Sequence, residues 1–131
     1  MMRKRKKITI ALVSHDNRKP NLAEWVNKNR EELQQFKLIG TSGTAKQISK
    51  ITGLKVKELG HGPTGGDIMI AHDILVGKIN VLIFFVDTAT AHGHEHYIQS
   101  LIEISITQKI PIALNDITAD CVLRYLLNSL K

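Results

Sequence analysis

The sequence predicts a single three-layer α/β domain built around a central, mainly parallel sheet of five strands. The chain has 131 residues, about the length of one domain, and 43% of them are hydrophobic while 23% are charged. Short apolar runs alternate with longer amphipathic stretches, as in strands joined by helices. Because the composition does not change abruptly, we expect one domain over residues 8–131 after a flexible basic leader at residues 1–7.

The first expected strand covers residues 8–13, which are β-branched and nearly all apolar, as in a strand covered on both faces. Pro20 opens a helix over residues 22–36, where apolar side chains recur at helical spacing. A short strand at residues 37–40 follows the helix. Residues 41–44 then form a turn that leads into the next element.

The second expected helix is capped by Ser42 or Thr44 and stops near Gly53, since glycine commonly ends a helix. A weaker strand follows at residues 55–59. A glycine-rich loop then leads into a third helix over residues 67–76.

The last part of the chain repeats this pattern. Residues 81–86 are the strongest buried-strand signal in the sequence. A polar loop leads from them into a helix over residues 97–108, and a last strand at 110–114 precedes a terminal helix through residue 127. Because helices separate the strands, we expect the strands to run parallel.

The net charge of +6 comes mainly from the leader. Five of the 18 Lys and Arg residues lie at positions 3–7, which leaves 13 basic residues against 12 acidic ones. A nucleic-acid-binding face needs its basic residues spread over the folded surface, so we expect no nucleic-acid partner, and binding through the leader is the least favoured alternative. No apolar run approaches the ~20 residues of a membrane span. The single Cys121 favours a reducing, cytoplasmic location.

Titratable and small residues gather in the loops that follow the expected strands. In an open parallel sheet these loops lie at one edge, where ligands bind. Five of the six histidines fall in them: His15, His61, His92, His94 and His96. We therefore expect the functional site at the carboxyl ends of the strands.

Three of these loops suit a phosphate. The glycine-rich loop at residues 60–66 allows close approach of its backbone, and the helix that starts at Asp67 attracts anions to its N-terminus. Residues 41–44 repeat this arrangement, although helix capping explains their hydroxyls equally well. Lys19 supplies a cation for a phosphate. Taken alone, Asp67 is more simply explained as a capping aspartate.

Residues 92–96, His-Gly-His-Glu-His, raise metal binding as an alternative, because alternate histidines can share a metal. No second cluster of metal-ligand type accompanies them in the sequence. We therefore expect no metal.

Four segments together resemble the methylglyoxal synthase family in order and spacing: residues 10–16, 62–67, 81–85 and 118–120. The glycine–proline segment that ends in Gly65-Gly66-Asp67 is the most specific. The resemblance covers nearly all of the chain after the leader and implies a methylglyoxal synthase-like fold. It also implies a cofactor-free, cytoplasmic lyase that converts dihydroxyacetone phosphate to methylglyoxal and phosphate through an enediolate. A homo-oligomer is implied as well, with a hexamer as one candidate.

The resemblance further implies roles for individual residues. Asp67 matches the catalytic base that takes a proton from the carbon next to the substrate carbonyl. His94 matches the histidine that polarises this carbonyl or shuttles protons at the enediolate oxygens. The residues expected to bind substrate or phosphate are His15, Asp16, Lys19, Thr41, Ser42, Gly43, Thr44, His61, Gly62 and Asp87.

The chain departs from the family pattern at several positions. Tyr97 stands where the family has a second catalytic carboxylate, and Glu95 and His96 are candidate substitutes nearby. Gly43 replaces a threonine in the family's Thr-Gly-Thr-Thr-Gly segment, and the chain ends at Lys131, sooner after its last helix than is usual. These departures leave open a second class of function, a phosphate-metabolite-binding or regulatory module of the same fold.

Overall fold

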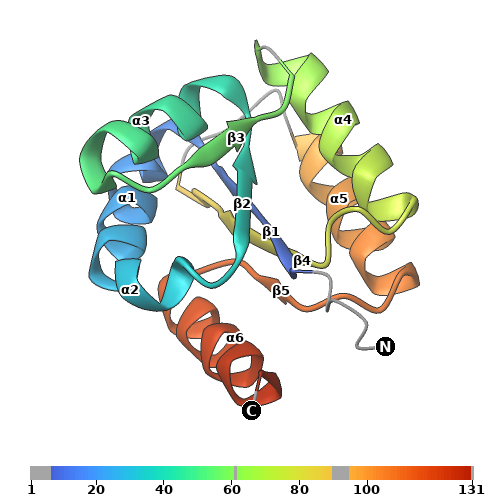
Figure 1. Ribbon diagram of the computed structural model, residues 1–131. Coiled ribbons are helices and arrows are strands. Elements are labelled where there is room, and N and C mark those ends of the chain that lie inside the picture. The colour runs from blue at the N-terminus through green and yellow to red at the C-terminus, as the bar shows by residue number, and fades with distance from the viewer. Residues whose placement is uncertain (1–6, 61, 90–94, 131) are drawn as a thin grey trace.

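The computed structural model (Figure 1) describes residues 7–60, 62–89 and 95–130. Its centre is a five-stranded sheet in the order β3-β2-β1-β4-β5, and all four neighbouring pairs are parallel. The strands are β1 (Thr9–Ser14), β2 (Lys37–Gly40), β3 (Val56–Glu58), β4 (Val81–Phe85) and β5 (Ile112–Ala113). The expected five-stranded parallel sheet is thus confirmed.

Helices cover both faces of the sheet and complete the three expected layers. They are α1 (Lys19–Lys28), α2 (Arg30–Leu33), α3 (Ser42–Thr52), α4 (Gly62–Leu75), α5 (Glu95–Thr107) and α6 (Asp116–Ser129), with a short 3-10 helix, η1 (Asp16–Arg18), before α1. Figure 1 shows α1, α3 and α6 against one face and α4 and α5 against the other.

Strand β1 lies at the centre of the sheet and contributes to both cores. Ile10 and Leu12 join the core under α1, α3 and α6, whereas Ala11 and Val13 join the core under α4 and α5. All four side chains are buried. This explains why residues 10–13 are all apolar, because a strand covered on both faces has no side chain directed to water. Each buried Ile or Leu stabilises the fold by about 1.5–3 kcal/mol relative to its exposed state.

The single helix expected over residues 22–36 is wrong, because the structure has two helices there. The helix α1 starts at Lys19 with Pro20 in its first turn, where a missing N–H costs little. It ends at Lys28, and the C-cap residue Asn29 donates from its side-chain Nδ2 to the carbonyl of Trp25 at 2.9 Å. An asparagine side chain that bonds a nearby backbone carbonyl in this way competes with continuation of the helix. A new helix, α2, begins at Arg30.

Three further expectations are corrected. Residues 41–44 are not a turn: Thr41 is the N-cap residue and α3 begins at Ser42, so neither Ser42 nor Thr44 caps the helix. The helix α4 begins at Gly62 rather than at Asp67, which places residues 62–66 in its first turns instead of in a loop. The last strand is also shorter than expected, with only Ile112 and Ala113 in the ladder. Within the described ranges, no helix has both the length and the apolar character needed to cross a membrane.

Candidate functional site

The sheet order fixes where a ligand-binding crevice can lie. From β1 the chain passes to α1 on one face, whereas from β4 it passes to α5 on the other. Because β1 and β4 are neighbours, their following loops diverge, so the expected ligand-binding crevice lies at the carboxyl ends of these two strands. The loops that follow β1, β2, β3 and β4 carry the residues expected from sequence to bind substrate.

His15 and Asp87 meet at this crevice. They follow β1 and β4 directly, and both are buried, with 7% and 5% of their surfaces exposed. The backbone N–H of Asp87 donates to Nδ1 of His15 at 2.8 Å, and the backbone N–H of His15 donates to the carbonyl of Phe85 at 3.2 Å. The imidazole also meets the ring of Phe84 edge-on, with centroids 5.3 Å apart. Two residues 72 positions apart in sequence are therefore adjacent, as the parallel sheet predicts.

Lys19 lies against the N-terminus of α3. A Cβ atom at Gly43, in the first turn of this helix, would be 3.3 Å from the Lys19 ammonium. The ammonium also pairs with Asp16 at 3.2 Å, but the Asp16 side chain is 92% exposed, so this ion pair contributes little. A cation and the positive end of a helix dipole thus face the same space. This arrangement suits an anion such as a phosphate.

The first turn of α3 offers several hydrogen-bonding groups to such an anion. The first N–H groups of a helix have no intrahelical acceptor, and Thr41 makes no side-chain capping bond here. The Thr44 hydroxyl is buried and has no hydrogen-bond partner among the described residues. A buried hydroxyl without a partner is costly, which makes it a candidate partner for a ligand oxygen.

Close glycine contacts bring the start of α4 to the start of α3. A Cβ atom at Gly66 would collide with the Thr41 side chain, and one at Gly60 would lie 2.7 Å from the Cα atom of Gly66. Gly60 also has a φ of +77°, which favours glycine. Because Asp67 follows Gly66 directly, its backbone lies next to the Thr41 end of α3. Gly60 and Gly66, which were expected to let the backbone approach a ligand, are therefore also needed for close packing between the two helices.

Some expected site residues cannot be placed beyond their position in the chain. His61 and His94 lie outside the described residues, as do His92 and most of the polar loop after β4. Gly62 is the first residue of α4, and Glu95 and Tyr97 lie in the first turn of α5. Among the described residues, no group of three or more His, Cys, Asp or Glu side chains could hold a metal ion.

The structure adds two residues that the sequence analysis missed. Asn17 donates from Nδ2 to Oδ2 of Asp87 at 2.9 Å. Glu58, at the end of β3, accepts a hydrogen bond from the Ser42 hydroxyl at 2.6 Å and lies 3.8 Å from the Lys46 ammonium. The Ser42 hydroxyl, expected to bind phosphate, is thus held by a carboxylate. Glu58 ends β3 and Asn17 closely follows β1, so both lie at the predicted edge of the sheet. Their place at the ends of the expected strands is the sequence signal that could have identified them.

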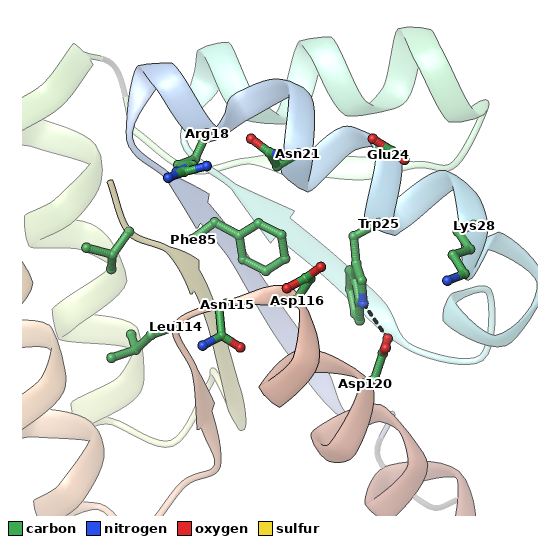
Figure 2. Close-up of a pocket in the computed structure, with 11 residues that line it drawn as sticks. Arg18, Asn21, Glu24, Trp25, Lys28, Phe85, Leu114, Asn115, Asp116 and Asp120 are labelled. Carbon is green, nitrogen blue, oxygen red and sulfur yellow. Dashed lines mark hydrogen bonds between the residues drawn. The ribbon is translucent and has the colours of Figure 1, made fainter. Parts of the chain in front are cut away.

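A cavity of 480 Å³ opens beside this crevice, between α1 and α6 (Figure 2). Its floor includes Trp25 and Phe85, whose ring centroids are 6.2 Å apart. The Trp25 indole N–H donates to Asp120 at 2.8 Å and so connects α1 to α6. The residues expected to bind substrate do not line this cavity. The segment at residues 118–120 therefore supports the packing of α6 rather than the phosphate-binding arrangement.

Comparisons with known proteins agree with this architecture. A family model described as "MGS-like domain" matches residues 21–114. The methylglyoxal synthase of Vibrio parahaemolyticus serotype O3:K6 is 44% identical over 110 residues, which are 84% of this chain and 73% of the relative. That of Clostridium botulinum (strain Alaska E43) is 39% identical over 115 residues, 88% of this chain and 97% of the relative. A crystal structure of methylglyoxal synthase from Elizabethkingia anophelis NUHP1 has a TM-score of 0.84 at 36% identity, covering 89% of this chain and 77% of that chain.

Proposed function

Because the chain belongs to the MGS-like domain family, we propose that it is a lyase that converts dihydroxyacetone phosphate to methylglyoxal and inorganic phosphate. The observation that carries the proposal is the position of the Lys19 ammonium against the N-terminus of α3, beside the first turns of α4 that lead to Asp67. An anion-binding arrangement next to a carboxylate base is what this substrate requires, since it carries a phosphate and an acidic C–H group in one small molecule.

The phosphate of the substrate occupies the start of α3 in this proposal. Lys19 neutralises part of its charge, and the N–H groups of residues 42–44 donate to its oxygens. The buried Thr44 hydroxyl gains a partner when the phosphate binds. The same groups later stabilise the phosphate as it leaves, so they act on the substrate and on the transition state.

Asp67 begins the reaction by removing a proton from the hydroxymethyl carbon next to the carbonyl. The carbonyl oxygen becomes an enediolate oxygen, and His94 donates a hydrogen bond to it. His94 then carries the hydroxyl proton of the deprotonated carbon to the enediolate oxygen. An aldehyde carbonyl forms at that carbon while the double bond shifts and the C–O bond to phosphate breaks. The phosphate leaves with the bonding electrons. The remaining enol gains a proton at its CH2 carbon and loses its hydroxyl proton to become methylglyoxal.

The test is turnover by the purified full-length chain. With dihydroxyacetone phosphate, the protein should release phosphate and methylglyoxal in equal amounts. The Asp67→Asn variant should lose about 10²–10⁴-fold in kcat, because the base is removed while shape and size are kept. Circular dichroism checks that the variant is folded. Wild-type protein with no turnover above a matched blank would exclude the lyase, and stabilisation by phosphate compounds without turnover would instead select the regulatory module.

We also propose that the protein is a homo-oligomer in the cytoplasm. The helix α4 supports this, because its outer face exposes the large apolar side chains of Ile68, Met69 and Leu75, and the exposed Val76 follows directly after its last residue. Large apolar side chains that gather on an exposed surface commonly mark a protein–protein interface. A second copy of the chain would cover this face, which begins one residue after Asp67. The free and exposed Cys121 suits the reducing cytoplasm.

A further inference from the structure

The hydrogen bond between Asp87 and His15 determines which ring nitrogen of His15 carries the proton. The donor is the backbone N–H of Asp87, and the acceptor is Nδ1 of the imidazole at 2.8 Å. A peptide N–H can only donate, so Nδ1 must present a lone pair. The proton of the ring is therefore on Nε2, and the ring is neutral. An imidazolium would carry a second proton on Nδ1 and would have to give up this bond.

The position of that backbone N–H depends in turn on how Asp87 is held. One carboxylate oxygen of Asp87 accepts from the Asn17 side chain at 2.9 Å, and the other accepts from the backbone N–H of Ala89 at 3.0 Å. Asn17 lies in η1, two residues after His15. The imidazole and the Asn17 amide thus both add side-chain bonds between the ends of β1 and β4.

We propose that Asn17 is a positioning residue which, by holding Asp87, keeps His15 as a neutral imidazole that donates from Nε2 to an oxygen of a bound phosphate ester. The inference deepens the proposed lyase function and rests on it for the identity of the ligand. It gives His15 a defined role, since a neutral ring with Nδ1 already bonded can donate a hydrogen bond from Nε2 but does not exchange protons at Nδ1. Proton transfer is left to other groups.

A positioning role for Asn17 can be told apart from a purely structural one by its effect on the His15 ring and on kcat. Loss of the Asn17 amide removes one of the bonds that hold the Asp87 carboxylate, so the backbone at Asp87 can shift and the His15 ring can adopt the other tautomer. The effect is expected on kcat more than on KM, because the oriented donor matters most as negative charge develops on oxygen. We expect kcat to fall about tenfold in Asn17→Ala, because the free energy of one hydrogen bond to a charged group corresponds to a rate change of about this size.

The primary experiment is nitrogen NMR of histidine-labelled full-length protein, with the His15 signals assigned by their loss in His15→Gln. Wild-type protein should show His15 as the neutral tautomer with the proton on Nε2. Asn17→Ala should show a mixture of ring states, and Asn17→Gln, which retains an amide donor, should restore the wild-type pattern at least in part. The control is Asn27→Ala, an exposed asparagine on α1, which should change neither the spectrum nor kcat.

The outcomes distinguish this inference from the proposed function. A wild-type His15 with its proton on Nδ1, or an Asn17→Ala variant that is folded and keeps the wild-type tautomer and kcat, overturns the inference even if the protein is an active lyase. An inactive wild-type protein whose His15 tautomer is fixed and depends on Asn17 refutes the lyase but supports the positioning role. In that case inorganic phosphate serves as the probe, and its addition should shift the Nε2 signal of His15 in wild type and less in Asn17→Ala.

Discussion

At the scale of single residues, the charges around the start of α3 balance attraction for an anion against repulsion. Lys19 and the helix N-terminus both attract negative charge to this position. Glu58 lies beside the same turn. Its carboxylate accepts a hydrogen bond from the Ser42 hydroxyl and lies 3.8 Å from the Lys46 ammonium. The affinity for phosphate therefore depends on opposing side chains whose contributions can be separated by substitution.

Lys19→Met should raise KM for dihydroxyacetone phosphate roughly ten- to hundredfold, because one hydrogen bond from a charged donor to phosphate is lost. Steady-state kinetics measure this change, and the thermal stabilisation by inorganic phosphate should fall in parallel. Lys28→Met is the matched control, since Lys28 is also on α1 but exposed at its far end. An unchanged KM in Lys19→Met would mean that the ammonium does not contact the substrate.

Glu58→Gln should have the opposite effect. Removal of the carboxylate charge relieves repulsion of the phosphate and weakens the hold on the Ser42 hydroxyl, so KM should fall about two- to fivefold at low ionic strength. The difference from wild type should shrink at high salt, because salt screens exposed charges. Glu31→Gln, an exposed glutamate on α2, should leave KM unchanged. A higher KM in Glu58→Gln would show that the Ser42–Glu58 bond supports the site instead of competing with the substrate.

At the scale of elements, the starts of α3 and α4 form one packed unit. The contact between Gly66 and the Thr41 side chain leaves no space for a methyl group, and Gly60 turns the chain tightly beneath it. The two helix N-termini are close together because these residues are small. The position of the Asp67 backbone thus depends on the contact between Gly66 and Thr41.

Gly66→Ala should destabilise the protein by about 1–3 kcal/mol, the usual cost of forcing a group into a packed interior. It should also lower kcat, because the displaced turn carries Asp67. Urea unfolding and steady-state kinetics measure the two effects. Gly53→Ala is the comparison: its φ of +75° makes alanine costly by about 1–2 kcal/mol, but its surroundings are open. That variant should lose stability and keep kcat, and equal kcat losses in both variants would refute the packing argument.

At the scale of the whole molecule, α4 connects the site to the surface proposed for self-association. Ile68 and Leu75 are 60% and 56% exposed on this helix, although the rest of the molecule buries most of its large apolar side chains. A stable assembly would remove this stripe of exposed apolar side chains (Ile68, Met69, Leu75 and Val76) from water. It would also hold the helix that carries Asp67 in place. Assembly and activity should therefore depend on each other.

Ile68→Glu should convert the oligomer to smaller species, because a buried charge without a partner is strongly unfavourable. Light scattering coupled to size-exclusion chromatography measures the mass in solution. Ile117→Glu is a suitable control, since Ile117 is 68% exposed on α6 and outside the stripe. A wild-type protein that is monomeric across its working concentrations would contradict the proposed assembly.

The amino-acid sequence by itself determined the fold class and the edge of the sheet at which the candidate site residues gather. Each parallel strand places its carboxyl end at one edge, so the order of strands and helices was enough to predict that residues near 15, 41, 62 and 87 gather there. Family membership follows from sequence as well, because the glycine segment ending in Asp67 is specific. The helix boundaries at Asn29, Ser42 and Gly62 were not predictable in this way, since side-chain bonds and close packing override local propensity.

Only the tertiary structure decided how the residues at that edge pair with one another. Periodicity reports which face a side chain occupies, but a hydrogen bond depends on positions fixed to a few tenths of an ångström by packing over the whole core. The bonds from the Asp87 backbone to His15 and from Asn17 to the Asp87 carboxylate join residues about 70 positions apart. The Ser42–Glu58 bond and the contact of Gly66 with Thr41 likewise form only when β2 and β3 pair in register.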